Sequence, residues 1–528
     1  MRCQFFWLLL GRIFINVRFI SGGITTPLSI PPSLYWDGDD GWWSKFQIQV
    51  GTPGQTVRLL PGTSASARST LWVVISEGCA DVDPNLTNCP NERGYLFQSN
   101  LSSTWSTQGI QNGIDGVIFS LNTFEEGVLG LTGNGSYGYD TIRLGLPGPN
   151  LPILQKQVLA GIWTDNYFLG SLGLSPVPFN FTILDDPQPS MLGTLRNQSL
   201  IPSASWAYAA GAHYQDPPVY GSLTLGGYDA SRFEPNNLTF PFAVDFSRDL
   251  LVSLQSITYD TIGSSPLLAS SIDIFIDSLV TELWLPVAVC EAFAQQFNLT
   301  WNAQGQLYLL DEMAHTALLV QNPTFIFTIG QAGGGADTTS IVLPYAAFDL
   351  NLTSPIVGDT TRYFPLKQAQ NSSQYTLGRT FLQAAYLIAD YERRNFSVSR
   401  ALFPSTSVSE NIIAIQPPRD DLQEKESRRF SRGKIAGIVI SVTAIFALAI
   451  AAVTFWRRFF KVRRQAAGSE RISMKEPATK VKADAELDNT NTYQLEGQQT
   501  IKVELPVSEH ALERYEIDSN VRVHEMGT

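Results

Sequence analysis

Two stretches of this 528-residue chain share one pattern, in which an apolar run leads into small polar residues and then into a Leu-Trp pair. The second stretch, residues 274–285, carries Asp277 directly after its apolar run. An aspartate held at such a position could act as a general acid or base. The first stretch, residues 59–73, has Gly62 before its Thr-Ser pair, and residues 50–76 contain no Asp or Glu. Two related lobes would produce such a repeat.

The sequence contains no motif for the other common kinds of catalytic or binding site. The four histidines are scattered and none lies in an HExxH arrangement, so we expect no metal site and no cofactor. Neither a GxSxG turn nor a GxxxxGK phosphate loop occurs. The net charge is −12 and the isoelectric point is near 4.9, so the chain has no basic footprint for nucleic acid.

The elements that must position Asp277 are predicted to be short strands between about residues 44 and 403. Residues 45–50 and 325–329 alternate apolar and polar side chains with period two. Residues 386–399 read as two strands around Glu-Arg-Arg-Asn, the pattern of a hairpin. One helix is expected after Pro286. Its apolar face would consist of Val287, Cys290, Phe293 and Phe297. The pattern therefore predicts an all-β domain with few helices.

Six motifs in order resemble the pepsin-type aspartic proteases, and as a set they look most like the membrane-anchored fungal type. They are Gly51-Thr52-Pro53 with Leu71-Trp72-Val73, Asn100 to Trp105, Gly138 to Ile142, Gly226-Gly227-Tyr228-Asp229, Asp277 to Pro286, and Leu377-Gly378 through Asp390. The resemblance implies a bilobal fold with a cleft between the lobes. We expect an N-terminal lobe over residues 24–250 and a C-terminal lobe over residues 251–404.

The catalytic centre that the resemblance implies is incomplete. The family uses two aspartates, one from each lobe, which share a proton. Asp277 matches the second aspartate, whereas Gly62 stands where the first is expected, nine residues after Pro53. Leu279 replaces the glycine of the second triplet and adds a bulky side chain between loops that approach closely. Val128 stands where the family carries its flap tyrosine.

A lone Asp277 cannot act as base and acid together, so we predict a proteolytically inactive protein. Losing one partner of an acid–base pair typically costs roughly 10²–10⁴ in rate. The alternative is an active anchored endopeptidase in which another carboxylate, such as Asp115 or Asp249, enters the cleft. A second alternative is a structural, wall-associated glycoprotein. The ligand of the interlobe cleft is left open between a peptide, a protein and a cell-wall component.

The cysteines are assigned partly by the resemblance. Cys79 and Cys89 match the family's small disulfide loop of the N-terminal lobe, and an exported compartment would support that bond. Cys290 lies on the apolar face of the predicted helix, which favours a buried free thiol over a nucleophile. The family's basic prosegment has no counterpart between residue 23 and the first motif.

The two ends of the chain predict export and anchoring. Residues 1–23 resemble a signal peptide. Residues 435–456 are uncharged and would span roughly 33 Å as a helix, enough for a bilayer core. Residues 405–434 are polar and form the predicted stalk, and residues 457–528 are charge-balanced and predicted to be a disordered cytoplasmic tail. Similar numbers of Lys and Arg flank the span, so charge alone does not orient it.

Glycosylation acceptors orient the chain better. Ten of the 20 asparagines between residues 24 and 434 begin N-x-[ST], against roughly one in six by chance. We therefore place the ectodomain outside the cell or in a lumen, on the plasma membrane or another membrane of the secretory pathway. The acceptors are Asn85, Asn100, Asn134, Asn180, Asn197, Asn237, Asn298, Asn351, Asn371 and Asn395.

Overall fold

The computed structural model describes residues 25–64, 70–110, 117–121, 124–146, 151–180, 186–260, 266–404 and 408–418. All of them belong to one compact unit that ends at residue 430. The predicted signal peptide, the transmembrane segment 435–456 and the tail 457–528 lie outside the described residues. No helix within the described ranges is long and apolar enough to cross a membrane.

The first sheet is eight-stranded and comes from the N-terminal half of the chain. Its strands run in the order β2-β3-β4-β9-β5-β8-β7-β6, and β3 also pairs with β7. Short strands rich in β-branched and aromatic residues favour this pleated, half-buried arrangement. The strands are β2 (Pro32–Asp37), β3 (Trp43–Val50), β4 (Gln55–Gly62), β5 (Leu71–Val74), β6 (Ile118–Ser120), β7 (Asn134–Leu144), β8 (Ile153–Ile162) and β9 (Gly170–Gly173).

The second sheet repeats the same core arrangement in the C-terminal half. Its order is β21-β20-β15-β16-β25-β17-β24. Four further strands form a small sheet beside it, in the order β18-β19-β23-β22. The strands are β15 (Leu251–Tyr259), β16 (Ile272–Ile276), β17 (Leu283–Pro286), β18 (Thr300–Asn302), β19 (Leu307–Leu309), β20 (Thr324–Gln331), β21 (Thr338–Pro344), β22 (Leu350–Leu352), β23 (Thr361–Phe364), β24 (Leu366–Ala369) and β25 (Thr376–Leu377).

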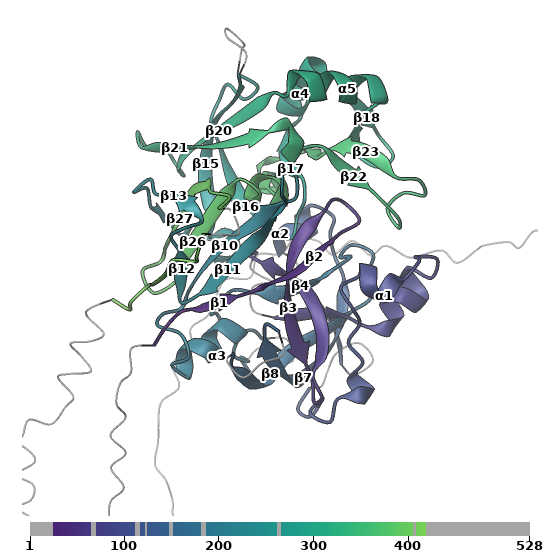
Figure 1. Ribbon diagram of the computed structural model, residues 1–528, viewed down its shortest axis with the longest axis vertical. Coiled ribbons are helices and arrows are strands. Elements are labelled where there is room, and N and C mark those ends of the chain that lie inside the picture. Colours follow the sequence, from purple (N-terminus) through teal and green to yellow (C-terminus); the bar gives the residue numbers. More distant parts are fainter. Residues whose placement is uncertain are drawn as a thin grey trace, which may run out of the picture. The chain divides into compact units, whose positions relative to one another are not determined.

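A third sheet joins the two halves, because it takes strands from both. Its order is β1-β11-β10-β26-β27-β13, with β14 on β27, and Figure 1 shows these strands between the other two groups. The predicted hairpin is confirmed, since β26 and β27 pair antiparallel. The strands are β1 (Leu28–Ile30), β10 (Ser205–Ala212), β11 (Val219–Leu225), β13 (Phe233–Glu234), β14 (Phe240–Pro241), β26 (Ala385–Asp390) and β27 (Asn395–Ala401).

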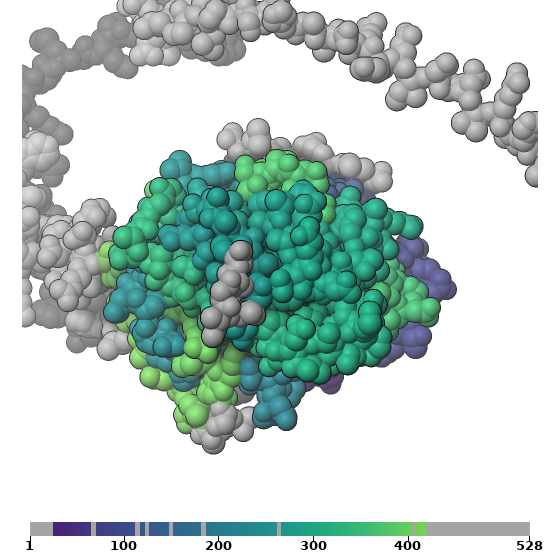
Figure 2. Space-filling model, turned by 90° about the horizontal axis from the view of Figure 1, so that it is seen from above, coloured from purple at the N-terminus to yellow at the C-terminus, as the bar shows by residue number. Residues whose placement is uncertain are grey.

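Helices are few and short, as the sequence pattern predicts. The helix expected after Pro286 is α4, and it buries Cys290, Phe293 and Phe297 on one face. Helices α4 and α5 and the neighbouring teal strands form most of the face seen in Figure 2. The helices named below are η1 (Gly78–Val82), α1 (Cys89–Glu92), α2 (Phe124–Val128), α3 (Met191–Asn197), α4 (Val287–Phe297), α5 (Glu312–Gln321), η5 (Ser372–Gln374) and α6 (Arg379–Leu382).

One continuous cluster of buried residues connects the three sheets. It runs from Ile48 in β3 through Trp206 in β10 to Phe327 in β20, all fully buried. Burial of apolar area on this scale is the main force that favours folding. Because the core is shared, the two halves stabilise each other. The predicted lobe boundary at residue 250 remains a prediction, since the joining sheet draws on both sides of it.

Part of the predicted stalk belongs to the folded unit. Strand β28 (Ile412–Ala414) pairs antiparallel with β12 (Gly227–Asp229). Asn411 N donates to the Asp229 carboxylate at 2.9 Å, and Ile415 N donates to Gly226 O at 3.1 Å. The residues that pair form a short apolar run, Asn-Ile-Ile-Ala-Ile at 411–415, inside a stretch that is otherwise polar.

The disulfide implied by the resemblance is present between Cys79, in η1, and Cys89, at the start of α1. The two residues are 10 apart in sequence. A cross-link that closes such a loop stabilises the fold by about 2–3 kcal/mol through the unfolded chain's lost entropy.

We expect the double variant Cys79→Ser/Cys89→Ser to lose about 2–3 kcal/mol of unfolding free energy. Chemical denaturation of the full-length protein measures this loss. A reducing agent should lower the stability of the parent protein and leave the double variant unchanged. Equal sensitivity of both proteins to the reductant would contradict a stabilising role for this bond.

A buried charge cluster holds the hairpin of β2 and β3. Asp37 accepts from Arg58 Nε at 2.8 Å and lies 2.5 Å from Lys45 Nζ. The Arg58 guanidinium lies 4.5 Å from the ring centres of both Tyr35 and Tyr95. Burial lowers the pKa of Lys45 to about 7, although Asp37 opposes the shift.

Stability should therefore rise with pH above neutrality. Between pH 7 and pH 10 the unfolded chain binds more protons at Lys45 than the folded chain does, so raising the pH favours the folded state. We expect a gain on the order of 1–2 kcal/mol between pH 7 and pH 9. Lys45→Met should flatten this slope, as measured by urea denaturation at each pH. Parallel slopes for the two proteins would exclude Lys45 as the cause.

Candidate functional site

The two predicted catalytic loops occupy equivalent places in the first two sheets. Strand β4 ends at Gly62 and pairs in parallel with β9, while β16 ends just before Asp277 and pairs in parallel with β25. The next strands, β5 and β17, pair antiparallel with the same partners. Each loop thus leaves its sheet beside a strand inserted between two others.

Reciprocal hydrogen bonds between Thr63 and Ser278 join the loops. Thr63 N donates to Ser278 Oγ at 3.0 Å, and Ser278 N donates to Thr63 Oγ1 at 2.9 Å. The Thr63 hydroxyl donates to Ser278 Oγ at 3.0 Å, and Ser278 Oγ donates to Pro61 O at 2.6 Å. Both residues are fully buried. The exchange pairs the residue before Thr63 with the residue before Ser278.

Gly62 and Asp277 are the residues that precede Thr63 and Ser278, and their assignment as the two dyad positions stays a prediction. Asp277 is fully buried, and its Oδ1 accepts from Leu279 N at 2.9 Å. Gly62 offers no side chain at the matching place. Its carbonyl accepts from Leu174 N at 3.3 Å and continues the sheet. The loop that should supply the first carboxylate therefore contributes backbone only.

Leu279 reaches across from the second loop to the first half of the protein. It packs against a buried cluster that includes Trp72, Ile110 and Tyr137. An apolar side chain in this position excludes water from the loop junction. The bulky residue noticed in the sequence is thus part of the packing between the halves.

The segment at the flap position contacts the C-terminal half. Leu129, just after α2, packs with Val280 and Trp284, and the Val128 carbonyl accepts from Gln374 Nε2 at 2.6 Å. The assignment of Val128 to the position of the family's flap tyrosine stays a prediction. The nearby Tyr137 is fully buried in the N-terminal half instead.

A carboxylate that the sequence did not single out meets the first loop. Glu126, in α2, is fully buried and accepts from the Ser64 hydroxyl. Of the substitutes considered from sequence, Asp115 lies outside the described residues, and Asp249 is buried two residues before β15. The sequence shows an acidic residue in the flap segment, but its contact with Ser64 could not be predicted.

The Arg379 side chain holds the loop that carries Asp277 through hydrogen bonds to its backbone. Its Nη1 donates to the carbonyls of Ser278 and Leu279 at 3.0 and 2.7 Å, and its Nη2 donates to Asp40 Oδ2 at 3.0 Å. Its guanidinium lies 4.9 Å from the Trp43 ring centre. Asp40 comes from the turn between β2 and β3, so this ion pair joins the chain's first hairpin to the second catalytic loop.

The remaining predicted residues fall as follows. Cys290 is buried, and its thiol donates a hydrogen bond to Lys367 O at 3.3 Å. Burial raises the pKa of this thiol to about 12, so Cys290 is not a nucleophile at neutral pH. Eight of the ten glycosylation acceptors are exposed, while Asn351 and Asn395 are half-buried. No cluster of three or more metal-ligating side chains occurs in the described part of the chain.

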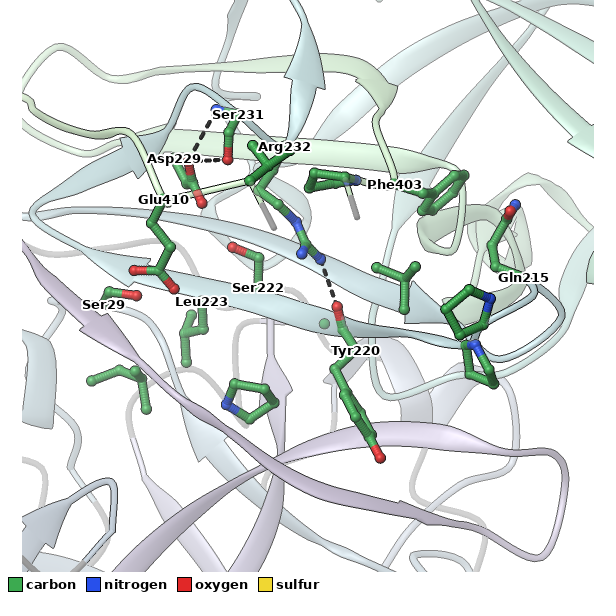
Figure 3. Close-up of a pocket in the computed structure, with 18 of the residues that line it drawn as sticks. Ser29, Gln215, Tyr220, Ser222, Leu223, Asp229, Ser231, Arg232, Phe403 and Glu410 are labelled. Carbon is green, nitrogen blue, oxygen red and sulfur yellow. Dashed lines mark hydrogen bonds between the residues drawn. The ribbon is translucent and has the colours of Figure 1, made fainter. Parts of the chain in front are cut away.

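A separate cavity of about 460 Å³ lies at the joining sheet (Figure 3). Arg232 points into it and donates to Tyr220 O at 2.5 Å, with Glu410 on another wall. The Asp229 carboxylate accepts hydrogen bonds from Ser231 and Asn411. The polar groups of this cavity mainly hold the segment that carries β28.

The two-lobed arrangement and the joined loops define an acid-protease fold. The family model described as eukaryotic aspartyl protease matches residues 45–401, and the chain belongs to this family. The resemblance predicted from the sequence is therefore confirmed.

The chain is similar to several fungal proteins. Barrierpepsin of Saccharomyces cerevisiae is 21% identical over 399 residues, covering 70% of this chain and 62% of barrierpepsin. Secreted aspartic protease 3 of Candida albicans is 24% identical over 376 residues, covering 70% and 81%. Candidapepsin of Candida tropicalis is 24% identical over 366 residues, covering 68% and 79%. The match spans less than two thirds of barrierpepsin.

Proposed function

We propose that this chain is a proteolytically inactive member of the aspartyl protease family that binds a ligand in its interlobe cleft. The observation that supports this proposal best is the Thr63–Ser278 exchange, which pairs Asp277 with Gly62. A shared-proton mechanism needs two carboxylates in contact, one to activate water and one to protonate the leaving amide. Glycine can supply neither function.

The environment of Asp277 supports a binding role as well. Leu279, two residues after Asp277, packs against the N-terminal half, and Leu129 packs against Val280 in the second loop. Apolar side chains therefore flank the loop that carries Asp277. The frame of the family is kept while the groups that do chemistry are replaced. Such a protein would keep a ligand cavity, of about 380 Å³ between residues 127–130 and the C-terminal half, and lose turnover.

We infer that the ectodomain faces the outside of the cell or a lumen, held by the segment 435–456. The exposed glycosylation acceptors and the Cys79–Cys89 bond support an exported compartment. The relatives from Candida albicans carry the word secreted in their names. A protease-protection assay on intact cells tests this placement, because it should remove the ectodomain and spare the tail.

The activity proposal is tested with full-length protein and a broad peptide library at pH 3–5. We expect no cleavage above background, and no difference between the parent and Asp277→Asn. Pepstatin-sensitive cleavage that disappears in Asp277→Asn would sink the proposal. That comparison also separates true turnover from a contaminating protease.

Glu126 favours one other candidate, an active endopeptidase with an unusual site. Its carboxylate meets Ser64 in the first triplet, the half that lacks an aspartate. In this case Glu126→Gln and Asp277→Asn should each abolish cleavage, whereas Glu92→Gln, in α1, should not. We rank this candidate second because Glu126 reaches the first triplet at Ser64, two residues after Gly62.

A further inference from the structure

A cavity of about 380 Å³ opens between the flap segment and the C-terminal half. Its volume is in the range of small-ligand sites, about 300–1,000 Å³. The flap contributes residues 127–130, and the other wall carries Trp284, Trp301 and Lys367. Four glutamines complete the lining: Gln306, Gln368, Gln370 and Gln374.

The two tryptophans give the cavity aromatic walls. Trp301 is half-buried, and its ring centre lies 4.8 Å from that of Tyr308, which fixes its orientation. Trp284 is only 7% exposed, and its Nε1–H has no acceptor within the described residues. This nitrogen is itself buried, so Trp284 contributes an apolar wall to the cavity. An aromatic face also attracts the slightly positive C–H edge of a saturated ring.

The amides give the cavity a neutral hydrogen-bonding surface. Each glutamine offers two donors and one acceptor oxygen, which together match adjacent hydroxyl groups. Gln368 and Gln374 donate to Tyr308 Oη and Val128 O, at 2.7 and 2.6 Å. No hydrogen bond within the described residues occupies the exposed side chains of Gln306 and Gln370, which leaves these amides for a ligand.

Charge is almost absent from this surface. Among the residues that line the cavity none is acidic, and Lys367 is the one charged group. Lys367 Nζ donates to Gly305 O at 3.3 Å and lies 5.8 Å from the Trp284 ring centre. An apolar peptide side chain would leave the amides of Gln306 and Gln370 unpaired, which a hydrogen-bonding site penalises.

We propose that this cavity binds a neutral oligosaccharide, with a sugar ring stacked on Trp301 and its hydroxyl groups hydrogen-bonded to the side chains of Gln306 and Gln370. The inference rests on the proposed binding function and names its ligand class. Two glycosylation acceptors lie beside the cavity in sequence, Asn298 before Trp301 and Asn371 after Gln370. The chain's own glycan is therefore the competing occupant.

The test uses full-length protein from which N-glycans have been removed, titrated by calorimetry with tetraoses of β-linked glucose, α-linked mannose and N-acetylglucosamine. We expect one of these to bind. Trp301→Ala should weaken binding at least 10-fold and Gln306→Ala about 3- to 10-fold, in line with a lost stacking or hydrogen-bonding contact. The matched controls Trp42→Ala, on the first hairpin, and Gln304→Ala, in the same turn as Gln306, should bind as the parent does.

The outcomes separate this inference from the function it rests on. Absence of binding to all three tetraoses at millimolar concentration overturns the oligosaccharide, while peptide binding in the same protein would leave the proposed binding function intact. Binding that appears only after loss of the Asn371 glycan, and equally in Asn371→Gln, shows that the cavity holds its own glycan and overturns an external ligand. Peptide cleavage would refute inactivity without affecting the sugar titration.

Discussion

Replacing Arg379 with leucine is expected to lower the free energy of unfolding by about 3–5 kcal/mol. The side chain of Arg379 is 5% exposed and that of Asp40 is 21% exposed, so the variant leaves a largely buried carboxylate without its cation. It also removes the donor to the carbonyls of Ser278 and Leu279. Each buried acceptor left without a donor adds about 1–3 kcal/mol.

Urea denaturation of the full-length protein measures the loss, and Arg400→Leu provides the control. Arg400 and Glu234 also form an ion pair, at 3.9 Å, but their side chains are 55% and 63% exposed. Exposed pairs contribute about 0–1 kcal/mol, so this variant should be nearly as stable as the parent. Arg379→Lys should fall between the two, because it keeps the charge and loses the planar fork. Similar losses of unfolding free energy for Arg379→Leu and Arg400→Leu would show that the contacts of Arg379 with Asp40 and the Asp277 loop contribute little to stability.

The pairing of the two loops could be predicted because it depends on short-range spacing. Counting nine residues from Pro53 leads to Gly62, and Thr63 beside it exchanges hydrogen bonds with Ser278, the neighbour of Asp277. Strand length and the turn after Pro53 fix this distance along the chain. That Gly62 replaces a catalytic aspartate stays a prediction. The hairpin of β26 and β27 was equally accessible, since it is local and its turn residues are adjacent.

The contacts around the loops could not be predicted, because they join residues far apart in sequence. Ser64 and Glu126 are separated by 62 positions, and Asp40 and Arg379 by 339. Side-chain periodicity reports which face of a strand is buried, but not which distant residue will face it. A carboxylate in the flap and an arginine after Leu377-Gly378 were visible, yet nothing local assigned their partners.

The predicted stalk shows a different reason why part of the fold could not be predicted from the sequence. Residues 405–434 are polar, and composition alone predicts an extended linker. Strand β28 nevertheless pairs with β12, and the turn around Asp229 is fastened by Asn411. Backbone donors and acceptors make this edge pairing, and every residue except proline carries both. The paired residues 411–415 read Asn-Ile-Ile-Ala-Ile, an apolar run that the average composition of residues 405–434 conceals.

The joined loops predict a strong energetic coupling between Thr63 and Ser278. Thr63→Val removes the acceptor of Ser278 N and the donor to Ser278 Oγ, while Ser278→Ala removes the acceptor of Thr63 N and the donor to Pro61 O. Each change leaves buried groups without partners and should cost about 2–4 kcal/mol. The double variant loses the same network only once. Its loss of unfolding free energy should therefore be clearly smaller than the sum of the two single losses.

A double-mutant cycle measures this coupling directly. We expect an interaction energy of about 1–3 kcal/mol from the unfolding free energies of the parent, the two single variants and the double variant. Thr63→Val combined with Thr194→Val is the matched cycle. Thr194 is buried in α3 and bonded to Ser190 O at 2.9 Å, so its effect should simply add to that of Thr63→Val. Additivity in the Thr63–Ser278 cycle would mean that the loops are positioned by their sheets alone. Coupling there would mean that the Thr63–Ser278 bonds themselves hold the two loops together.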